Sequence, residues 1–303
     1  MTMRLSHLQP LVAVLTSAAV MAPAPSRGAD AGYAAEVQAW RQNREAGLKA
    51  DGGWLTVAGL FWLKPGANRF GSAKDNDIVL PASAPARAGR FDVKGARIAV
   101  RFEAGVAAQV EGRTVAQAAL HSDASATAEV VTLGPLRMHV IERGGRLAIR
   151  LKDLNAESRR TFTGLRWFPV DERYRVTARF VANPELKPLA VPNILGQVEK
   201  MPSPGYAVFE MDGREHRITG VFETPGATEL FFIFRDETSG KETYPAGRFV
   251  YSALPKNGQL VLDFNKAYNP PCAFTAYATC PLPPKENWLG RRIEAGELSY
   301  GHH

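Results

Sequence analysis

The sequence predicts a mainly β protein: antiparallel β-sandwich or barrel-like sheets, packed as two β subdomains, with a short N-terminal helix. Short runs rich in Val, Leu and Phe recur at close spacing, as in strand-rich folds. Glycine (27 residues) and proline (21 residues) are enriched and separate these runs. Hydrophobic residues make up 45% of the chain and charged residues 22%, so a buried core is expected.

Residues 1–29 are predicted to be a secretory signal peptide. Arg4 provides a positive start, residues 11–21 form an apolar run, and small residues follow as far as Ala29. An uncleaved membrane anchor is the alternative, but this run is too short to span a bilayer. We therefore expect a periplasmic or secreted protein with no stable membrane insertion after cleavage.

Residues 30–183 are expected to form a helix followed by a first β subdomain. Ala35, Trp40 and Leu48 share one side of a helix predicted over residues 33–50, which ends before a Gly-Gly pair. Farther along, runs 136–142 and 146–152 flank Gly144 and Gly145 and predict a tight hairpin.

Five prolines between residues 184 and 204 predict a crossing between two β layers or domains. Residues 205–303 are then expected to form a C-terminal β subdomain with a polar loop block. Its strands are predicted over residues 206–211, 216–222, 229–235, 248–252 and 259–264.

The formal net charge of +7 is concentrated between residues 131 and 180, where eleven Lys and Arg face five Asp and Glu. Most of these arginines are spaced through strand-like sequence, which favours a solvated sheet face over a polyanion site. They include Arg146, Arg150, Arg166, Arg173, Arg175 and Arg179. We expect no nucleic-acid partner.

The two cysteines, Cys272 and Cys280, lie in one loop-like stretch. In an oxidising compartment such a pair most often forms a disulfide, which would stiffen this loop. Two free buried thiols, metal ligation and a reactive thiol are the alternatives.

Common catalytic and cofactor motifs are missing from the sequence. It has no Gly-x-Ser-x-Gly, no His-Glu-x-x-His and no Cys-x-x-Cys, and its six histidines show no ligand spacing. We therefore predict no metal site and no cofactor, and we assign no catalytic residue.

The block from Phe231 to Glu297 carries the candidate functional residues. Polar side chains there follow the ends of predicted strands, beside the Pro270-Pro271 pair and the cysteines. Arginine and lysine could grip an anionic group, and a buried carboxylate could serve as a general base. An internal ion-pair network is an equally supported interpretation. The ligand-binding candidates are Arg235, Asp236, Lys241, Glu242, Tyr244, Arg248, Asp263, Asn265, Lys266 and Tyr268.

Several motifs in this block resemble a bacterial family catalogued as domain of unknown function 1684. They are residues 234–236, 238–244, 246–249, 262–274 and 278–284, with similar segments upstream from Gly53. The resemblance implies no activity, because none is established for that family.

A weaker resemblance covers residues 68–90, which are similar to the opening strands of forkhead-associated domains, readers of phosphothreonine. Ser72 and residues 85–89 stand where that family has its phosphate-gripping groups. This resemblance therefore implies a strand order and no phosphopeptide site.

Three functional hypotheses follow. The first is binding of a small polar or anionic molecule in a pocket formed by the C-terminal block. The second is a hydrolase that uses Asp or Glu as acid and base in that pocket, with Arg or Lys stabilising an oxyanion. The third is a structural envelope module in which the block is an ion-paired fold lock. The oligomeric state is left open.

Overall fold

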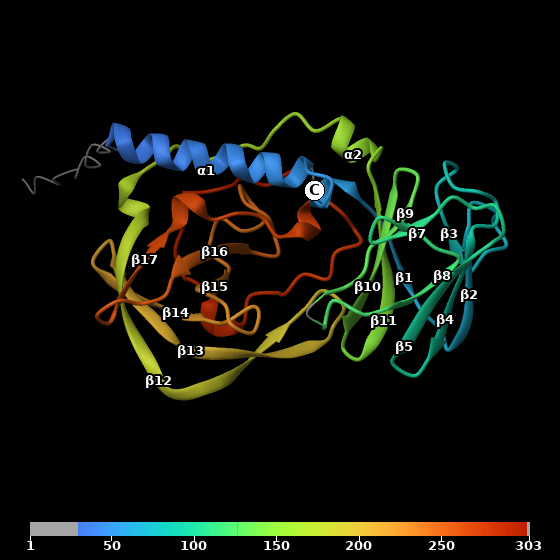
Figure 1. Cartoon of the computed structure of the whole chain (residues 1–303). Helices are drawn as coiled ribbons and strands as arrows, with labels where there is room; N and C mark the ends of the chain where they lie inside the picture. The colour runs from blue at the N-terminus through green and yellow to red at the C-terminus, as the bar shows by residue number, and fades with distance from the viewer. Residues whose placement is uncertain (1–29, 126, 302–303) are drawn as a thin grey trace, which may run out of the picture.

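The computed structural model describes residues 30–125 and 127–301, and over these residues the fold is mainly β (Figure 1). Most strand pairs are antiparallel, as the sequence predicts; the short pair of β2 (Gly66–Gly71) and β3 (Ile78–Val79) is parallel. The predicted signal peptide lies outside the described residues.

The predicted N-terminal helix is present as α1 (Ala31–Lys49). The carboxylate of Asp30 caps it by accepting a hydrogen bond of 2.7 Å from the Gly32 amide. Its buried residues, Tyr33, Val37, Arg41 and Leu48, recur at helical spacing. The helix lies along the C-terminal half of the chain, and this buried face packs against it (Figure 1).

Two sheets from the first half of the chain pack around one core. The six-stranded sheet has the order β1 (Val57–Trp62), β11 (Arg146–Asp153), β10 (Leu136–Arg143), β9 (Val131–Leu133), β6 (Gln109–Val110) and β7 (Arg113–Thr114). The five-stranded sheet has the order β3, β2, β4 (Gly89–Lys94), β5 (Arg97–Phe102) and β8 (Gln117–Leu120). Phe70, Phe91, Val140 and Ile149 are buried between them.

The hairpin predicted at Gly144 and Gly145 joins β10 to β11, with Arg143 opposite Arg146. Both glycines have positive φ, 56° and 71°, which suits a turn whose twist matches the strands. This hairpin sets the position of Arg143 and Arg150 in the sheet.

The second half of the chain forms a four-stranded sheet and a two-stranded sheet. The four-stranded sheet has the order β14 (Arg214–Gly220), β13 (Val198–Met211), β12 (Arg175–Pro192) and β17 (Gln259–Asp263). Strands β15 (Glu229–Phe234) and β16 (Arg248–Ala253) form the other sheet. A second core contains Phe209, Phe232, Phe234, Leu262 and Phe264.

Residues 184–204, predicted to cross between layers, instead lie mostly in the paired strands β12 and β13, with Pro188 opposite Pro202. Proline is tolerated there because no further strand of the described residues pairs along the outer edges of this part of the hairpin. β17 pairs only with residues 175–179 of β12, and β14 only with residues 205–211 of β13. The register also shifts between Ala182 and Lys187, next to Pro184.

The remaining elements are one short α-helix and single turns of 3₁₀-helix. They are α2 (Glu157–Arg160), η1 (Trp54–Thr56), η2 (Glu172–Tyr174), η3 (Phe264–Lys266), η4 (Pro271–Ala273) and η5 (Lys285–Asn287). No helix in the part of the chain that the structure describes is long and apolar enough to cross a membrane.

Candidate functional site

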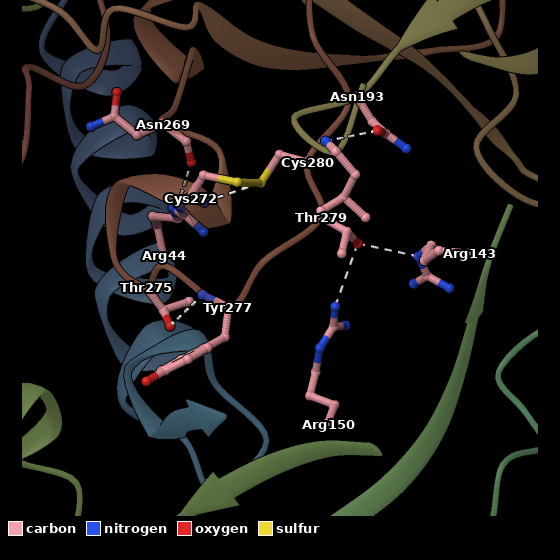
Figure 2. The surroundings of a disulfide bond; sticks show 11 residues. Arg44, Arg143, Arg150, Asn193, Asn269, Cys272, Thr275, Tyr277, Thr279 and Cys280 are labelled. Carbon is pink, nitrogen blue, oxygen red and sulfur yellow. Dashed lines mark hydrogen bonds between the residues drawn. A yellow bond between two sulfur atoms is a disulfide. The ribbon is translucent and has the colours of Figure 1, made fainter. Parts of the chain in front are cut away.

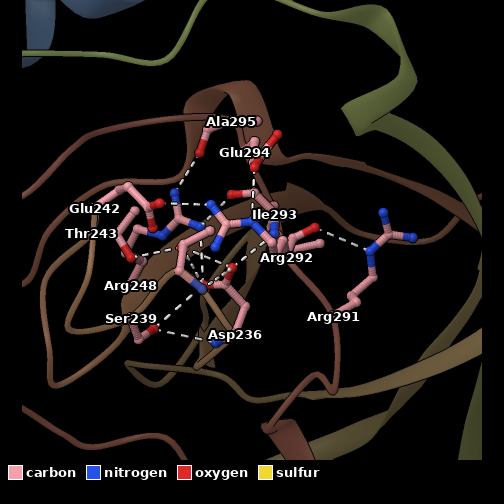
Figure 3. Close-up of polar contacts among 11 residues, drawn as sticks. Asp236, Ser239, Glu242, Thr243, Arg248, Arg291, Arg292, Ile293, Glu294 and Ala295 are labelled. Carbon is pink, nitrogen blue, oxygen red and sulfur yellow. Dashed lines mark hydrogen bonds and ion pairs between the residues drawn. The ribbon is translucent and has the colours of Figure 1, made fainter. Parts of the chain in front are cut away.

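The structure brings two of the predicted residues, Asp236 and Arg248, into one buried ion pair (Figure 3). Arg248 Nη2 lies 3.2 Å from Asp236 Oδ1 and donates to the carbonyl of Ile293 at 2.9 Å, and Nη1 donates to the carbonyl of Ala295. The Asp236 carboxylate also accepts from the Ile293 amide at 2.8 Å and from Thr238. Both side chains are fully buried, so the pair belongs to an internal network of hydrogen bonds.

Lys241, Glu242, Tyr244 and Arg235 lie outside this network. Glu242 pairs with Arg292 at 2.7 Å on the surface, and this hydrogen bond lowers the pKa of the Glu242 carboxyl. Lys241 and Arg235 are exposed, and the Arg235 guanidinium stacks on the Trp288 ring. Tyr244 packs against a small core beneath α1, and burial raises its pKa.

Asp263, Asn265 and Lys266 attach the end of β17 to α1. The Tyr33 hydroxyl donates to Asp263 Oδ1 at 2.7 Å and accepts from Asn265 Nδ2 at 2.9 Å. Lys266 pairs with Glu36 and lies 3.5 Å from Asp263. Burial, and then the hydrogen bond to Asp263, raise the pKa of the Tyr33 phenol. These contacts fix the helix to the sheet.

Tyr268 belongs to a neighbouring cluster that the sequence does not reveal. The Arg44 guanidinium lies over the Tyr268 ring, 4.5 Å from its centroid, and 3.5 Å from the carboxylate of Glu297. Burial raises the pKa of Glu297 to about 7, and it also raises the pKa of Tyr268. Glu297 Oε1 and Asn269 Oδ1 are buried without a hydrogen-bond partner.

Cys272 and Cys280 form a disulfide, with Cα atoms 6.2 Å apart. The bond closes the loop after Pro271, and the Cys280 carbonyl accepts a hydrogen bond of 3.1 Å from the Ile194 amide. The loop is thereby fixed against the turn between β12 and β13. Thr279, next to Cys280, points toward the first-half sheet (Figure 2).

A cavity of about 520 Å³ opens where this loop meets strands β10 and β11. Thr279 Oγ1 accepts from Arg143 Nε at 3.2 Å and lies 3.5 Å from Arg150 Nη2, and both arginines line the cavity (Figure 2). Aromatic and apolar side chains complete the lining, among them Trp54, Met201, Phe231 and Phe249. The cavity therefore combines cationic, hydroxyl and apolar surfaces, as small-molecule sites do.

Arg150 is the unusual member of this lining. It is 5% exposed, its Nε has no hydrogen-bond partner, and its guanidinium lies over the Trp54 ring. No carboxylate of residues 30–125 and 127–301 comes within 4.0 Å of it, whereas Arg143 forms a two-point pair with Asp123 at 2.8 and 3.0 Å. Burying a cation without a counter-charge is costly, and such sites are often functional.

The surroundings of Arg150 carry positive charge. Burial and Arg143 lower its pKa to about 10. His139 faces Arg150 across the β10–β11 ladder, and burial, with Lys152 and Arg150 nearby, lowers the pKa of His139 to about 4. A negative group placed at Arg150 would relieve this repulsion.

The placement of Arg150 corrects the expectation of a solvated sheet face. Arg146, Arg166, Arg173, Arg175 and Arg179 are exposed as expected, but Arg150 is buried because the disulfide loop and Trp54 cover it. The regular arginine spacing gave no sign of this, since the covering residues are distant in the sequence.

The described residues include no group of three or more His, Cys, Asp or Glu side chains that could hold a metal ion. The structure thus offers an arginine-lined cavity and, apart from it, the fully buried Asp236–Arg248 pair.

The family model described as Protein of unknown function (DUF1684) matches residues 160–298. Residues 160–298 of the chain belong to this family. The matched DUF1684 segment contains the Asp236–Arg248 pair, Glu297 and the disulfide loop with Thr279. Arg143 and Arg150 precede it, so the cavity is built from both sides of the family boundary.

None of the curated proteins compared with this chain matches it. A solved structure of an uncharacterized protein from gene locus rrnAC0354 of Haloarcula marismortui is 31% identical, with a TM-score of 0.39. That match covers 47% of this chain and 80% of the other.

Forkhead-associated domains also match. The FHA-2 domain of the Mycobacterium tuberculosis ABC transporter Rv1747 is 32% identical, with a TM-score of 0.22, over 29% of this chain and 77% of the domain. The FhaA FHA domain, solved in complex with the intracellular domain of Rv3910, is 16% identical, with a TM-score of 0.22. It matches 31% of this chain and 97% of its own.

Proposed function

We propose that this protein is exported and binds a small polar molecule through a carboxylate or phosphate group held by Arg150. The observation that carries the proposal is a buried guanidinium without a carboxylate partner that lines a cavity of about 520 Å³. A planar guanidinium can form two parallel hydrogen bonds to such a group, and the Thr279 hydroxyl lies beside it. Export is supported by the signal-peptide pattern of residues 1–29 and by the disulfide.

This site differs in position from the one that the sequence indicates. Asp236 and Arg248 satisfy each other inside the protein, so a structural role suits them better than ligand contact. The disulfide loop remains part of the site, because it contributes Thr279, Cys280 and Pro281 to the cavity.

Hydrolysis is not proposed, because the carboxyl group with a raised pKa lies outside the cavity. Glu297, whose pKa is raised to about 7, is fully buried and does not line this space. A general base must come within reach of its substrate.

The test is calorimetric titration of the full chain, after any natural processing, with inorganic phosphate, acetate and phenylphosphate. The variant is Arg150→Met, and the matched control is Arg146→Met, an exposed arginine on the same strand. We expect Arg150→Met to weaken binding of at least one probe about 10- to 100-fold, as for loss of a charge-assisted hydrogen bond. Arg146→Met should leave it unchanged.

The melting temperature of Arg150→Met distinguishes a ligand-binding role of Arg150 from a structural role. Arg150→Met should keep or raise the melting temperature, because it removes a desolvated charge that no carboxylate compensates. A large fall in melting temperature, or equal binding by both variants, would refute the proposal.

A further inference from the structure

The charges around the cavity do not suit a purely anionic ligand. Its lining includes two guanidinium groups, Arg143 and Arg150, and four carboxylates, Asp123, Glu142, Glu199 and Glu223. Arg143 is neutralised by Asp123. In the part of the chain that the structure describes, the cation Arg150 then has no carboxylate within 4.0 Å. The carboxylates of Glu142, Glu199 and Glu223 have no cation within 4.0 Å.

These unpaired charges come from different parts of the fold. Arg150 lies on β11, beside Arg143 at the end of β10, so the first-half sheet supplies the cations. Glu199 lies on β13, and Glu223 follows β14, so the second-half sheet supplies two of the acids. Phe231 and Phe249, on β15 and β16, add apolar surface to the same cavity.

From this arrangement we infer that the ligand is a zwitterion with an apolar body, of the class of a small peptide or amino acid. Its carboxylate binds Arg150 and Thr279, its protonated amine faces Glu199 and Glu223, and its apolar part packs on Phe231 and Phe249. This inference rests on the proposed function and adds a positive charge, the protonated amine, to the ligand.

Each ligand charge removes one electrostatic cost. A carboxylate at Arg150 compensates a buried cation that has no carboxylate within 4.0 Å in the described part of the chain. An amine near Glu199 and Glu223 offsets the repulsion that these carboxylates exert on any anion. Because both glutamates are exposed, their contribution is smaller than that of the buried Arg150 and weakens with salt.

The test is calorimetric titration of the full disulfide-bonded chain with three matched probes. They are the dipeptide alanyl-phenylalanine, its N-acetyl derivative, which lacks the amine charge, and its C-terminal amide, which lacks the carboxylate. We expect the free dipeptide to bind at least 10-fold more tightly than either blocked form. Raising the salt concentration should narrow the difference between the free and N-acetyl forms.

Variants of the cavity residues test which of them bind the carboxylate and the amine of the dipeptide. Arg150→Met should remove the preference for the free dipeptide over the amide. Glu199→Gln with Glu223→Gln should remove the preference over the N-acetyl form, and glutamine preserves the acceptor for the Tyr251 hydroxyl that binds Glu223. The control is Glu210→Gln, an exposed glutamate on β13 outside the cavity.

The outcomes are distinguishable. If the N-acetyl form binds as tightly as the free dipeptide while Arg150→Met still weakens both, the ligand is an anion. The zwitterion inference is then wrong and the proposed function stands. If Arg150→Met changes no affinity, both are wrong.

Discussion

Arg248 Nη2 lies 3.2 Å from Asp236 Oδ1 inside a region where neither side chain reaches solvent. Arg248 donates to the backbone of Ile293 and Ala295, and Asp236 accepts from the Ile293 amide and from Thr238. The pair therefore joins β16 and the turn after β15 to the C-terminal segment. Two separate charges in the sequence act in the structure as a single crosslink.

Removing one member of this pair should destabilise the protein severely. Asp236→Ala leaves the Arg248 guanidinium buried and uncompensated, and we expect a loss of about 3–5 kcal/mol in the free energy of unfolding. The double variant Asp236→Ala with Arg248→Met should recover part of that loss. Urea denaturation measures both, with Arg292→Ala as the control for the exposed pair with Glu242. Additive effects of the two substitutions would contradict a coupled pair.

Glu297 should make stability fall as pH rises. Burial raises its pKa from 4.5 to about 7, so between these values the folded protein keeps a proton that the unfolded chain releases. The free energy of unfolding should therefore decrease by about 3 kcal/mol from pH 4.5 to above pH 7. Glu297→Gln should lose this dependence, and the exposed Glu294→Gln should retain it. An unchanged pH profile in Glu297→Gln would show that folding does not shift the pKa of Glu297.

The disulfide should contribute about 2–3 kcal/mol through the short loop that it closes. Cys272→Ser with Cys280→Ser should lower the melting temperature by the same amount as reduction of the natural protein. Intact mass after alkylation should show two added groups only when a reductant precedes the alkylating agent. Alkylation without reductant would contradict the bond.

Asn287 should be a strong stabilising residue, because its buried side chain bridges two sheets. Its Oδ1 accepts from the Thr219 amide at 2.7 Å, and its Nδ2 donates to the carbonyls of Thr219 and Ile233 at 2.9 Å. Asn287→Ala leaves these backbone groups of β14 and β15 unpaired and should cost about 2–4 kcal/mol in denaturant unfolding. The exposed Asn155→Ala should cost far less; equal losses would be inconsistent with the bridge.

Local sequence rules predict much of the fold. The Gly144–Gly145 turn and the alternation of Leu260, Leu262 and exposed Val261 lead to the observed hairpin and strand. The proline-containing strands β12 and β13 escape such rules, because a proline's tolerance depends on whether its outer edge is paired, which is a tertiary property.

The site is less predictable for a related reason. Charge and proline content direct attention to the block after Phe231, and the disulfide loop there does line the cavity. Arg150 looks like any surface arginine in its own strand, and only the fold shows that Thr279 and Trp54 cover it. Its lack of a carboxylate partner likewise depends on residues that no local pattern specifies.

The position of α1 has a consequence for how the chain folds. Tyr33 and Arg44 obtain their partners from Asp263, Asn269 and Glu297, more than 200 residues later in the chain. Closing a loop of this length costs conformational entropy before any contact compensates for it, and this slows folding. The helix is thus synthesised before these partners, so we expect it to dock late, and chains that end before β17 should leave it without its sheet. Folding should finish only once nearly the whole chain is available.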